Sequence, residues 1–160
     1  MSKVYLISGF QNWGKTYSIE ELFKGRKRFY NDSLYPFGGY NFCVQSQSND
    51  DLGQRDFEKK ITSRRTQLRN KGLQFTHLMA AFCPTKEPNN DSCEIIKNLF
   101  SNDQVFIIAI EYKWCTHAKL QVEELQNYYS TLRNVSIHTL RGDDIRSKGR
   151  RLETLLQPLL

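Results

Sequence analysis

No apolar stretch in this sequence is long enough to cross a membrane. A bilayer-spanning helix needs ~20 consecutive apolar residues, and no run among the 160 residues approaches that length. The opening MSKVYLISG also lacks the longer apolar region and the small-residue cleavage site of a secretory signal. These absences predict a cytoplasmic protein with no membrane partner.

Cysteine is scarce and shows no paired spacing. The four cysteines form no C-x-x-C pair, which argues against a zinc ribbon, and free thiols persist in a reducing compartment, which argues against a disulfide frame. They are Cys43, Cys83, Cys93 and Cys115. Cys115 and His117 would bind zinc only if the fold brought further ligands to them.

Internal repeats, low-complexity tracts and long Pro/Gly/Ser linkers are absent as well. Because domains commonly contain ~100–150 residues, we expect one domain over residues 1–160. Lys and Arg number 23 against 17 Asp and Glu, for a net charge of +6. That charge would attract nucleotides or nucleic acid at long range, but it also occurs in proteins that need it only for solubility.

Short β-rich apolar runs alternate with helical patterns along the chain. Strands are predicted at residues 4–8, 41–45, 75–82, 105–111 and 135–140. Helices are predicted at residues 15–23, 54–70, 93–100, 117–133 and 144–156. The order is a strand followed by a helix, repeated five times.

The strands favour a parallel sheet, because runs such as Val-Phe-Ile-Ile-Ala-Ile at 105–110 offer no polar side to water. The fold class predicted is therefore α/β, a three-layer sandwich with a mainly parallel five-stranded sheet. In such sheets ligands bind beyond the carboxyl ends of the strands. Functional residues are expected at 9–16, 46–51, 83–91, 111–117 and 141–144.

Residues 9–16, Gly-Phe-Gln-Asn-Trp-Gly-Lys-Thr, fit the pattern G-x-x-x-x-G-K-[ST] between a predicted strand and a predicted helix. Gly9 and Gly14 allow successive backbone N–H groups to turn inward toward an anion, and a helix N-terminus adds about half an elementary charge. Lys15 would supply an ammonium to the β- and γ-phosphates, and the Thr16 hydroxyl would ligate Mg²⁺.

This motif in its context resembles the P-loop NTPase superfamily. The resemblance covers the first strand, the loop and the first helix, and the remaining topology is compatible with it. It implies binding of a Mg-nucleoside triphosphate. The residues expected to contact the nucleotide are Gly9, Asn12, Trp13, Gly14, Lys15, Thr16 and Tyr17. ATP is favoured over GTP, because the Asn/Thr-Lys-x-Asp element of GTPases is only poorly approximated by Thr-Lys-Glu-Pro at 85–88, after the wrong strand.

The sequence departs from this superfamily where an acidic residue should end a strand and hold Mg²⁺. The run 75–82 continues into Cys83-Pro84 without a carboxylate, which weighs against efficient hydrolysis. The substitutes are Glu111, at the end of the most apolar strand, and the pair Asp50-Asp51. The alternatives are a solvated strand end for Glu111 and helix capping by Asn49 or Asp50. The predicted catalytic residues are Lys15, Glu111 and Asp51, and the predicted metal ligands are Thr16, Asp50 and Glu111.

Arginines could stabilise the charge on a transferred phosphoryl group. The candidates are Arg55, Arg64, Arg65 and Arg69 in one helix, and Arg141, Arg146, Arg150 and Arg151 around the last. Most of them are expected on solvated faces. Arg146 and Arg150, four residues apart, would share one helix face and could bind an anion together.

Three functions fit these patterns. The first is a P-loop ATPase or small kinase-like phosphotransferase. The second is a nucleotide-dependent interaction or switch protein with little turnover. The third is a nucleic-acid binder whose basic segments 24–30 and 141–151 contact the phosphates, with the nucleotide as regulator.

Overall fold

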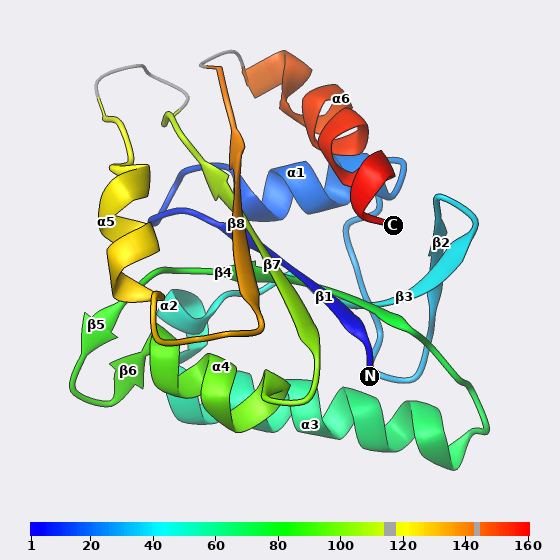
Figure 1. Ribbon diagram of the computed structural model, residues 1–160. Coiled ribbons are helices and arrows are strands. Elements are labelled where there is room, and N and C mark those ends of the chain that lie inside the picture. The colour runs from blue at the N-terminus through cyan, green and yellow to red at the C-terminus, as the bar shows by residue number, and fades with distance from the viewer. Residues whose placement is uncertain (114–117, 143–144) are drawn as a thin grey trace.

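The computed structural model describes residues 1–113, 118–142 and 145–160, and within 145–147 it describes the backbone only. Its central feature is a six-stranded sheet in the order β2-β3-β4-β1-β7-β8 (Figure 1). The five predicted strands are all present, as β1 (Lys3–Ser8), β3 (Tyr40–Gln45), β4 (His77–Phe82), β7 (Gln104–Ile110) and β8 (Val135–Leu140). These five run parallel to one another, which confirms an α/β fold with a mainly parallel sheet.

The prediction of a five-stranded sheet was wrong, because the sheet has six strands. The additional strand, β2 (Tyr35–Phe37), pairs antiparallel with β3 at the edge of the sheet. It contains only three residues, one of them proline, so no alternation of polar and apolar residues announces it. Gly38 and Gly39 form the tight turn between the two strands, both with positive φ. A separate two-stranded hairpin joins β5 (Lys86–Glu87) to β6 (Asn90–Asp91).

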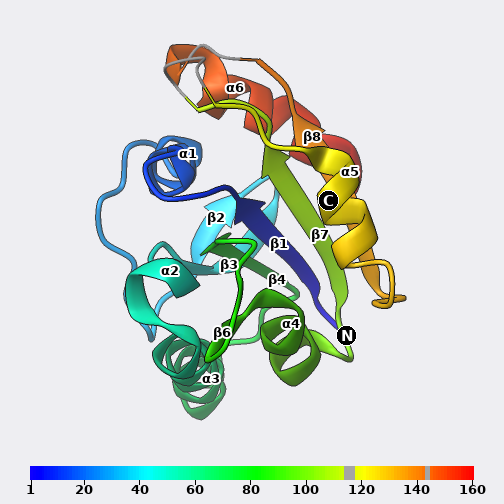
Figure 2. The same cartoon turned by 90° about the vertical axis from the view of Figure 1, so that its left-hand side faces the viewer.

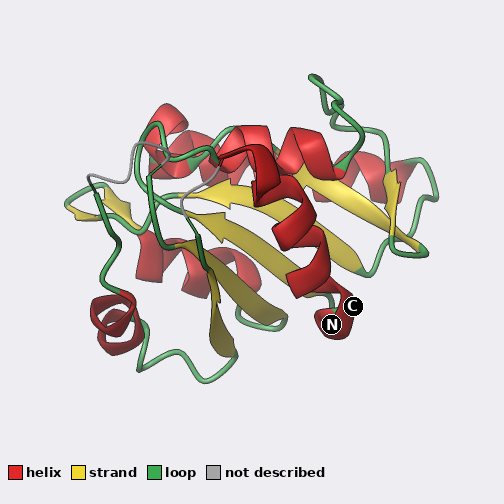
Figure 3. Ribbon diagram, turned by 90° about the horizontal axis from the view of Figure 1, so that it is seen from above, coloured by secondary structure: helices red, strands yellow, loops and turns green. Residues whose placement is uncertain are grey.

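Helices cover both faces of the sheet. Figure 2 shows α1 (Lys15–Leu22) and α6 (Ile145–Leu156) on one face, and α2 (Asn49–Leu52), α3 (Gln54–Asn70) and α4 (Ser92–Phe100) on the other. Seen from above in Figure 3, α6 lies across the strands. After α5 (Val122–Tyr128), the hydroxyl of the C-cap residue Tyr129 forms a hydrogen bond of 2.7 Å with the Ser92 hydroxyl at the start of α4. These layers are the sandwich that the apolar strands predict.

Helix boundaries differ from the sequence prediction at α2 and α5. Helix α3 begins and ends as predicted, whereas α5 is limited to seven residues between Gln121 and Tyr129. The four-residue helix α2 was not predicted, because it is shorter than the two turns that a helical apolar pattern needs. A 3₁₀ turn, Gln157–Leu159, follows α6.

The core lies between the layers, on both sides of the central strands. Every residue from Val4 to Ile7 in β1 and from Val105 to Ile110 in β7 is buried. Their continuous burial explains the absence of alternation in these strands, since neither face of the sheet meets water. Among the described residues, no helix combines the length and apolar character needed to span a bilayer.

Candidate functional site

The segment that joins β1 to α1 lies at the carboxyl edge of the sheet, beyond its central strands (Figure 1). The Gly9 N–H donates to the carbonyl of Phe82, 3.2 Å away, so the loop starts from the junction of β1 and β4. Parallel strands with a helix on each face place such a loop at the edge where ligands bind. The predicted strand, loop and helix are therefore contiguous in the structure, as the motif requires.

The backbone conformation and the packing of this loop require glycine at two positions. Gly14 has φ 83°, a left-handed conformation that is costly for residues with a Cβ. A Cβ on Gly9 would lie 3.1 Å from the Cβ of Trp13, tighter than ordinary packing allows. Asn12, with φ 62°, adds a second left-handed turn, which asparagine tolerates better than most residues. The loop therefore curls back over its own start.

The N-terminus of α1 has no side-chain cap and no acidic residue in its first turn. Its first N–H groups and the positive end of its dipole consequently face the loop without competition from a carboxylate on the helix. Lys15, only 6% exposed, folds its ammonium over the loop and donates to the Phe10 carbonyl at 2.9 Å. This arrangement of N–H groups and one ammonium is suited to an anion.

The loop and α2 enclose a pocket of about 250 Å³. It is lined by Gln11, Asn12, Trp13, Gly14, Lys15, Thr16, Tyr17, Asp50 and Asp51. Of the predicted site residues, Gly9 and Glu111 alone are missing from this lining. Trp13 is 5% exposed and packs edge-on against Phe10, with ring centroids 5.7 Å apart, so its ring supports the loop from inside.

A carboxylate reaches the end of β4 from another element. The acidic residue that the sequence lacks would follow Phe82, where Cys83 stands, and Phe82 pairs with Ser8 of β1. Asp50 of α2 lies beside the Cys83 thiol. Its Oδ2 is 3.5 Å from the Lys15 ammonium. Burial first, and then the negative charge of Asp50, raise the pKa of the Cys83 thiol to about 12. The thiol therefore stays protonated beside the carboxylate.

Asn49 fixes α2 against the end of β4. Its fully buried amide accepts a hydrogen bond from the Cys83 N–H at 2.7 Å and donates to the Cys83 carbonyl at 3.1 Å. It also donates to Thr85 Oγ1 and Asn90 Oδ1, both at 3.0 Å. Sequence reasoning considered Asn49 only as a helix cap. The cap is Ser48 instead, and Asn49 sets the position of the following aspartate.

The two aspartates of α2 have different tasks. Asp51 Oδ2 accepts hydrogen bonds from the Ser48 N–H at 3.0 Å and the Ser48 hydroxyl at 2.9 Å, which completes a capping box. Asp50 contacts the Ser48 hydroxyl through one oxygen and Lys15 through the other. Capping therefore occupies Asp51, and Asp50 is the carboxylate that faces the lysine.

Oxygen donors suitable for magnesium lie around this pocket. Mg²⁺ keeps several waters and takes one or two protein carboxylates together with phosphate oxygens. Thr16 donates its hydroxyl proton to the Ser46 carbonyl at 2.9 Å, which leaves its oxygen lone pairs available to a cation. Asp50 supplies the carboxylate. Because no group of three or more His, Cys, Asp or Glu side chains forms a metal site within the described residues, the other ligands would be phosphate and water.

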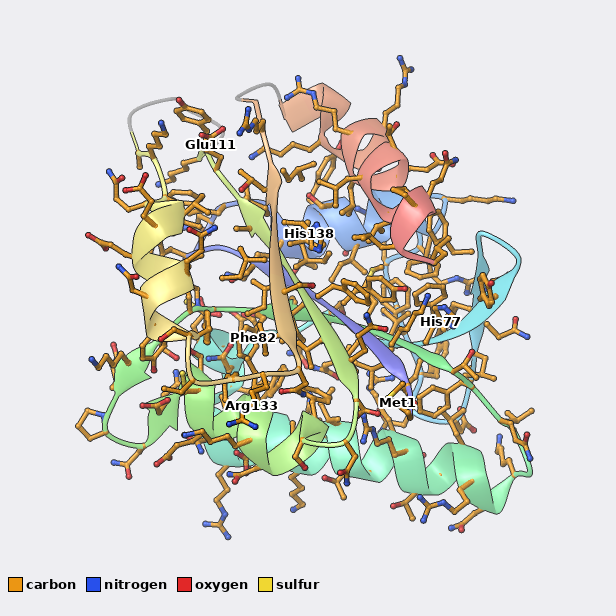
Figure 4. All side chains as sticks on the ribbon, viewed as in Figure 1. Met1, His77, Phe82, Glu111, Arg133 and His138 are labelled. Atoms are coloured by element: carbon orange, nitrogen blue, oxygen red, sulfur yellow. The ribbon has the colours of Figure 1, made fainter. Side chains whose placement is uncertain are left out.

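Glu111 lies elsewhere. It follows β7, on the opposite side of β1 from β4, and Figure 4 shows it beyond the tip of that strand and away from Phe82. Its Oε1 is 3.6 Å from the Lys119 ammonium, and both line a separate pocket of about 320 Å³ with Arg141. The Leu120 N–H donates to the Glu111 carbonyl at 2.7 Å, which directs the chain toward α5. The structure thus separates Glu111 from the Lys15 pocket.

Of the predicted arginines whose side chains the structure describes, none lines the Lys15 pocket. Buried Arg64 donates to Gln45 and to the carbonyls of Phe29 and Tyr30, so it supports the connection between α1 and β2. Arg65 pairs with Asp103 at 2.8 Å. The side chain of Arg146, and the whole of Cys115 and His117, lie outside the described residues.

The sequence matches no protein-family model and no curated protein. Among solved structures, the fold is similar to shikimate kinase from Bacteroides thetaiotaomicron, with 10% sequence identity, a TM-score of 0.40 and 98% of each chain covered. A similarity this distant does not extend to substrate or activity.

Proposed function

We propose that this protein binds a Mg-nucleoside triphosphate at the loop that runs from Gly9 to Thr16, and that ATP is its nucleotide. The observation that supports this most is the meeting of Lys15 and Asp50 at one pocket. The loop supplies N–H groups and an ammonium for phosphates, and Asp50 supplies the acid that the end of β4 lacks. A tight turn that matched the motif by accident would not require a carboxylate from a distant helix.

Each residue of the pocket has a distinct role in this proposal. Lys15 neutralises the β- and γ-phosphates. Thr16 keeps its hydrogen bond to Ser46, which turns its lone pairs toward the metal. Asp50 holds the metal directly or through water. Bound magnesium would supply charge neutralisation along the phosphates. Asp51 acts on the site indirectly, through the cap of α2.

We further propose that the protein is an enzyme that hydrolyses ATP or transfers its phosphoryl group. A switch with little turnover was favoured by the missing acid after Phe82. The presence of the Asp50 carboxylate 3.5 Å from the Lys15 ammonium supports turnover instead. Phosphoryl transfer depends mainly on positioning and on electrostatic stabilisation of the phosphate oxygens. Lys15, the N-terminus of α1 and Asp50 provide these elements from three segments of the fold.

Calorimetric titration with Mg-ATP and Mg-GTP, with phosphate release followed in the same samples, tests this proposal. Lys15→Ala is compared with Lys97→Ala, which removes an exposed lysine of α4 far along the chain from the loop. We expect wild type and Lys97→Ala to bind Mg-ATP equally, and Lys15→Ala to lose binding. Absence of nucleotide binding by the wild type would overturn the proposal, and binding without phosphate release or transfer would restrict it to the switch function.

A further inference from the structure

A buried lysine of the C-terminal helix α6 contacts the backbone of the loop from Gly9 to Thr16. Lys148 of α6 is 1% exposed. Its Nζ donates to the Tyr112 carbonyl at 3.0 Å and reaches the Trp13 carbonyl at 3.4 Å. Tyr112 lies just beyond β7, and Trp13 precedes Gly14 in the loop. One ammonium therefore connects three segments that lie far apart in the sequence.

Helix α6 is held close enough to α1 to make this reach possible. Next to Lys148, Gly149 lies where an added Cβ would be 3.0 Å from the Cβ of Glu21 in α1. A larger residue there would push the helices apart and withdraw the lysine. The burial of the Lys148 ammonium therefore depends on the close approach of α6 to α1.

Lys148 has no carboxylate at ion-pair distance within the described residues, where each ion pair involves another lysine or arginine. Burial lowers its pKa, with the charge of Arg151 as a smaller cause. A buried ammonium whose partners, as far as the chain is described, are neutral carbonyls is costly, and an apolar side chain of similar size would serve packing better. A gain elsewhere must offset this cost.

The geometry of the Trp13–Gly14 peptide shows what that gain can be. In a trans peptide the C=O and the following N–H point in opposite directions. With the Trp13 carbonyl turned back to Lys148, the Gly14 N–H points the other way, toward the side of the loop that an anion would occupy. In the described part of the chain, the Gly14 N–H makes no backbone hydrogen bond.

We propose that Lys148 is a positioning residue of the phosphate site: it holds the Trp13 carbonyl so that the Gly14 N–H faces the phosphates, and its buried charge is balanced when they bind. This inference rests on the proposed nucleotide binding. The low dielectric behind the loop strengthens the attraction between ammonium and phosphates, although they do not touch. Helix α6 is then coupled to the bound nucleotide.

The experiment compares Lys148→Met, which keeps the length and removes the charge, with Lys148→Arg, which keeps the charge. Lys97→Met is the control, because Lys97 is an exposed lysine of α4 that does not line the Lys15 pocket. Binding of Mg-ATP and of Mg-tripolyphosphate is measured by calorimetry, and thermal unfolding is measured with and without ligand.

We expect Lys148→Met to weaken both ligands roughly 10- to 100-fold, the effect of losing a hydrogen bond to a charged group. Lys148→Arg should recover much of this loss, and Lys97→Met should bind like wild type. Without ligand, Lys148→Met should unfold at or above the wild-type temperature, because it removes a buried charge that forms no ion pair within the described part of the chain.

The outcomes separate this inference from the proposed function. If wild type binds and Lys148→Met binds equally well, Lys148 has no positioning role while the proposed function stands. If Lys148→Met is destabilised without ligand and Lys148→Arg restores stability but not affinity, the lysine is structural and the inference is wrong. If wild type itself binds neither ligand, the proposed function fails and the inference fails with it.

Discussion

Lys15 Nζ lies 3.5 Å from Asp50 Oδ2, although Asp50 belongs to a different helix and follows a different strand. This contact brings a lysine from the helix after β1 together with a carboxylate from the helix after β3. Both side chains are largely buried, at 7% and 18% exposure, so solvent screens their attraction less than at the surface. An anion in the pocket would compete with Asp50 for Lys15, and a bound cation would relieve that competition.

Asp50→Asn should therefore reduce the benefit of magnesium rather than abolish nucleotide binding. We expect wild type to bind ATP more tightly with Mg²⁺ than with EDTA, and Asp50→Asn to lose about tenfold of that difference. The neighbouring Asp51→Asn is the control, because the Asp51 carboxylate accepts hydrogen bonds from Ser48 in the capping box of α2. It should keep the magnesium response and lose up to about 1 kcal/mol of stability. Equal magnesium responses in wild type and Asp50→Asn would contradict the assignment of Asp50.

Gly14→Ala should impair nucleotide binding beyond its effect on stability. Gly14 and Gly25 have similar positive φ values, 83° and 74°, and an added Cβ meets nothing within 4 Å at either position. Each alanine substitution should cost about 1–2 kcal/mol in the free energy of unfolding, from backbone strain alone. Only Gly14→Ala should weaken Mg-ATP in calorimetry, because Gly25 lies after α1. Equal binding by both variants would rule out a special role for the Gly14 peptide.

Asn49→Ala should destabilise the protein and disturb the magnesium response together. The substitution leaves the buried N–H and carbonyl of Cys83 without their partners, which we expect to cost about 2–4 kcal/mol in urea unfolding. Exposed Asn98, whose amide donates to Glu58 at 3.0 Å, gives the comparison. Asn98→Ala should change stability by less than about 0.5 kcal/mol. A loss of similar size in both variants would show that Asn49 does not hold α2 in place.

The sequence predicted the strand, loop and helix around Gly9 to Thr16 because the signals there are local. Two glycines, a lysine and a threonine at fixed spacing follow an apolar run directly, and the structure places them in the predicted order. It also predicted the parallel sheet, since continuous apolar runs leave no side of a strand for water. The edge strand β2 and the short helix α2 escaped prediction because three and four residues are too few to show a period.

The sequence did not identify which carboxylate meets Lys15, and it left Glu111 and the pair Asp50-Asp51 as candidates. Glu111 and Asp50 both follow apolar strands, and their local patterns are equally compatible with a metal ligand. The order of the strands decides between them. Glu111 follows β7 on one side of β1, whereas Asp50 belongs to α2, which Asn49 attaches to the end of β4 on the other side. Asn49 is recognised by its burial and by its hydrogen bonds to residues far along the chain, and a sequence alone displays neither.

Local chemistry thus determined the loop from Gly9 to Thr16, the helix that follows it and the apolar strands that form the sheet, because these depend on neighbours within a few residues. Tertiary structure alone decided which side chains meet that loop. Lys15 meets Asp50 across 35 positions of sequence, and Lys148 meets Trp13 across 135. Such contacts follow from the order of strands and from helices packing on both faces of the sheet, and no local pattern encodes that order.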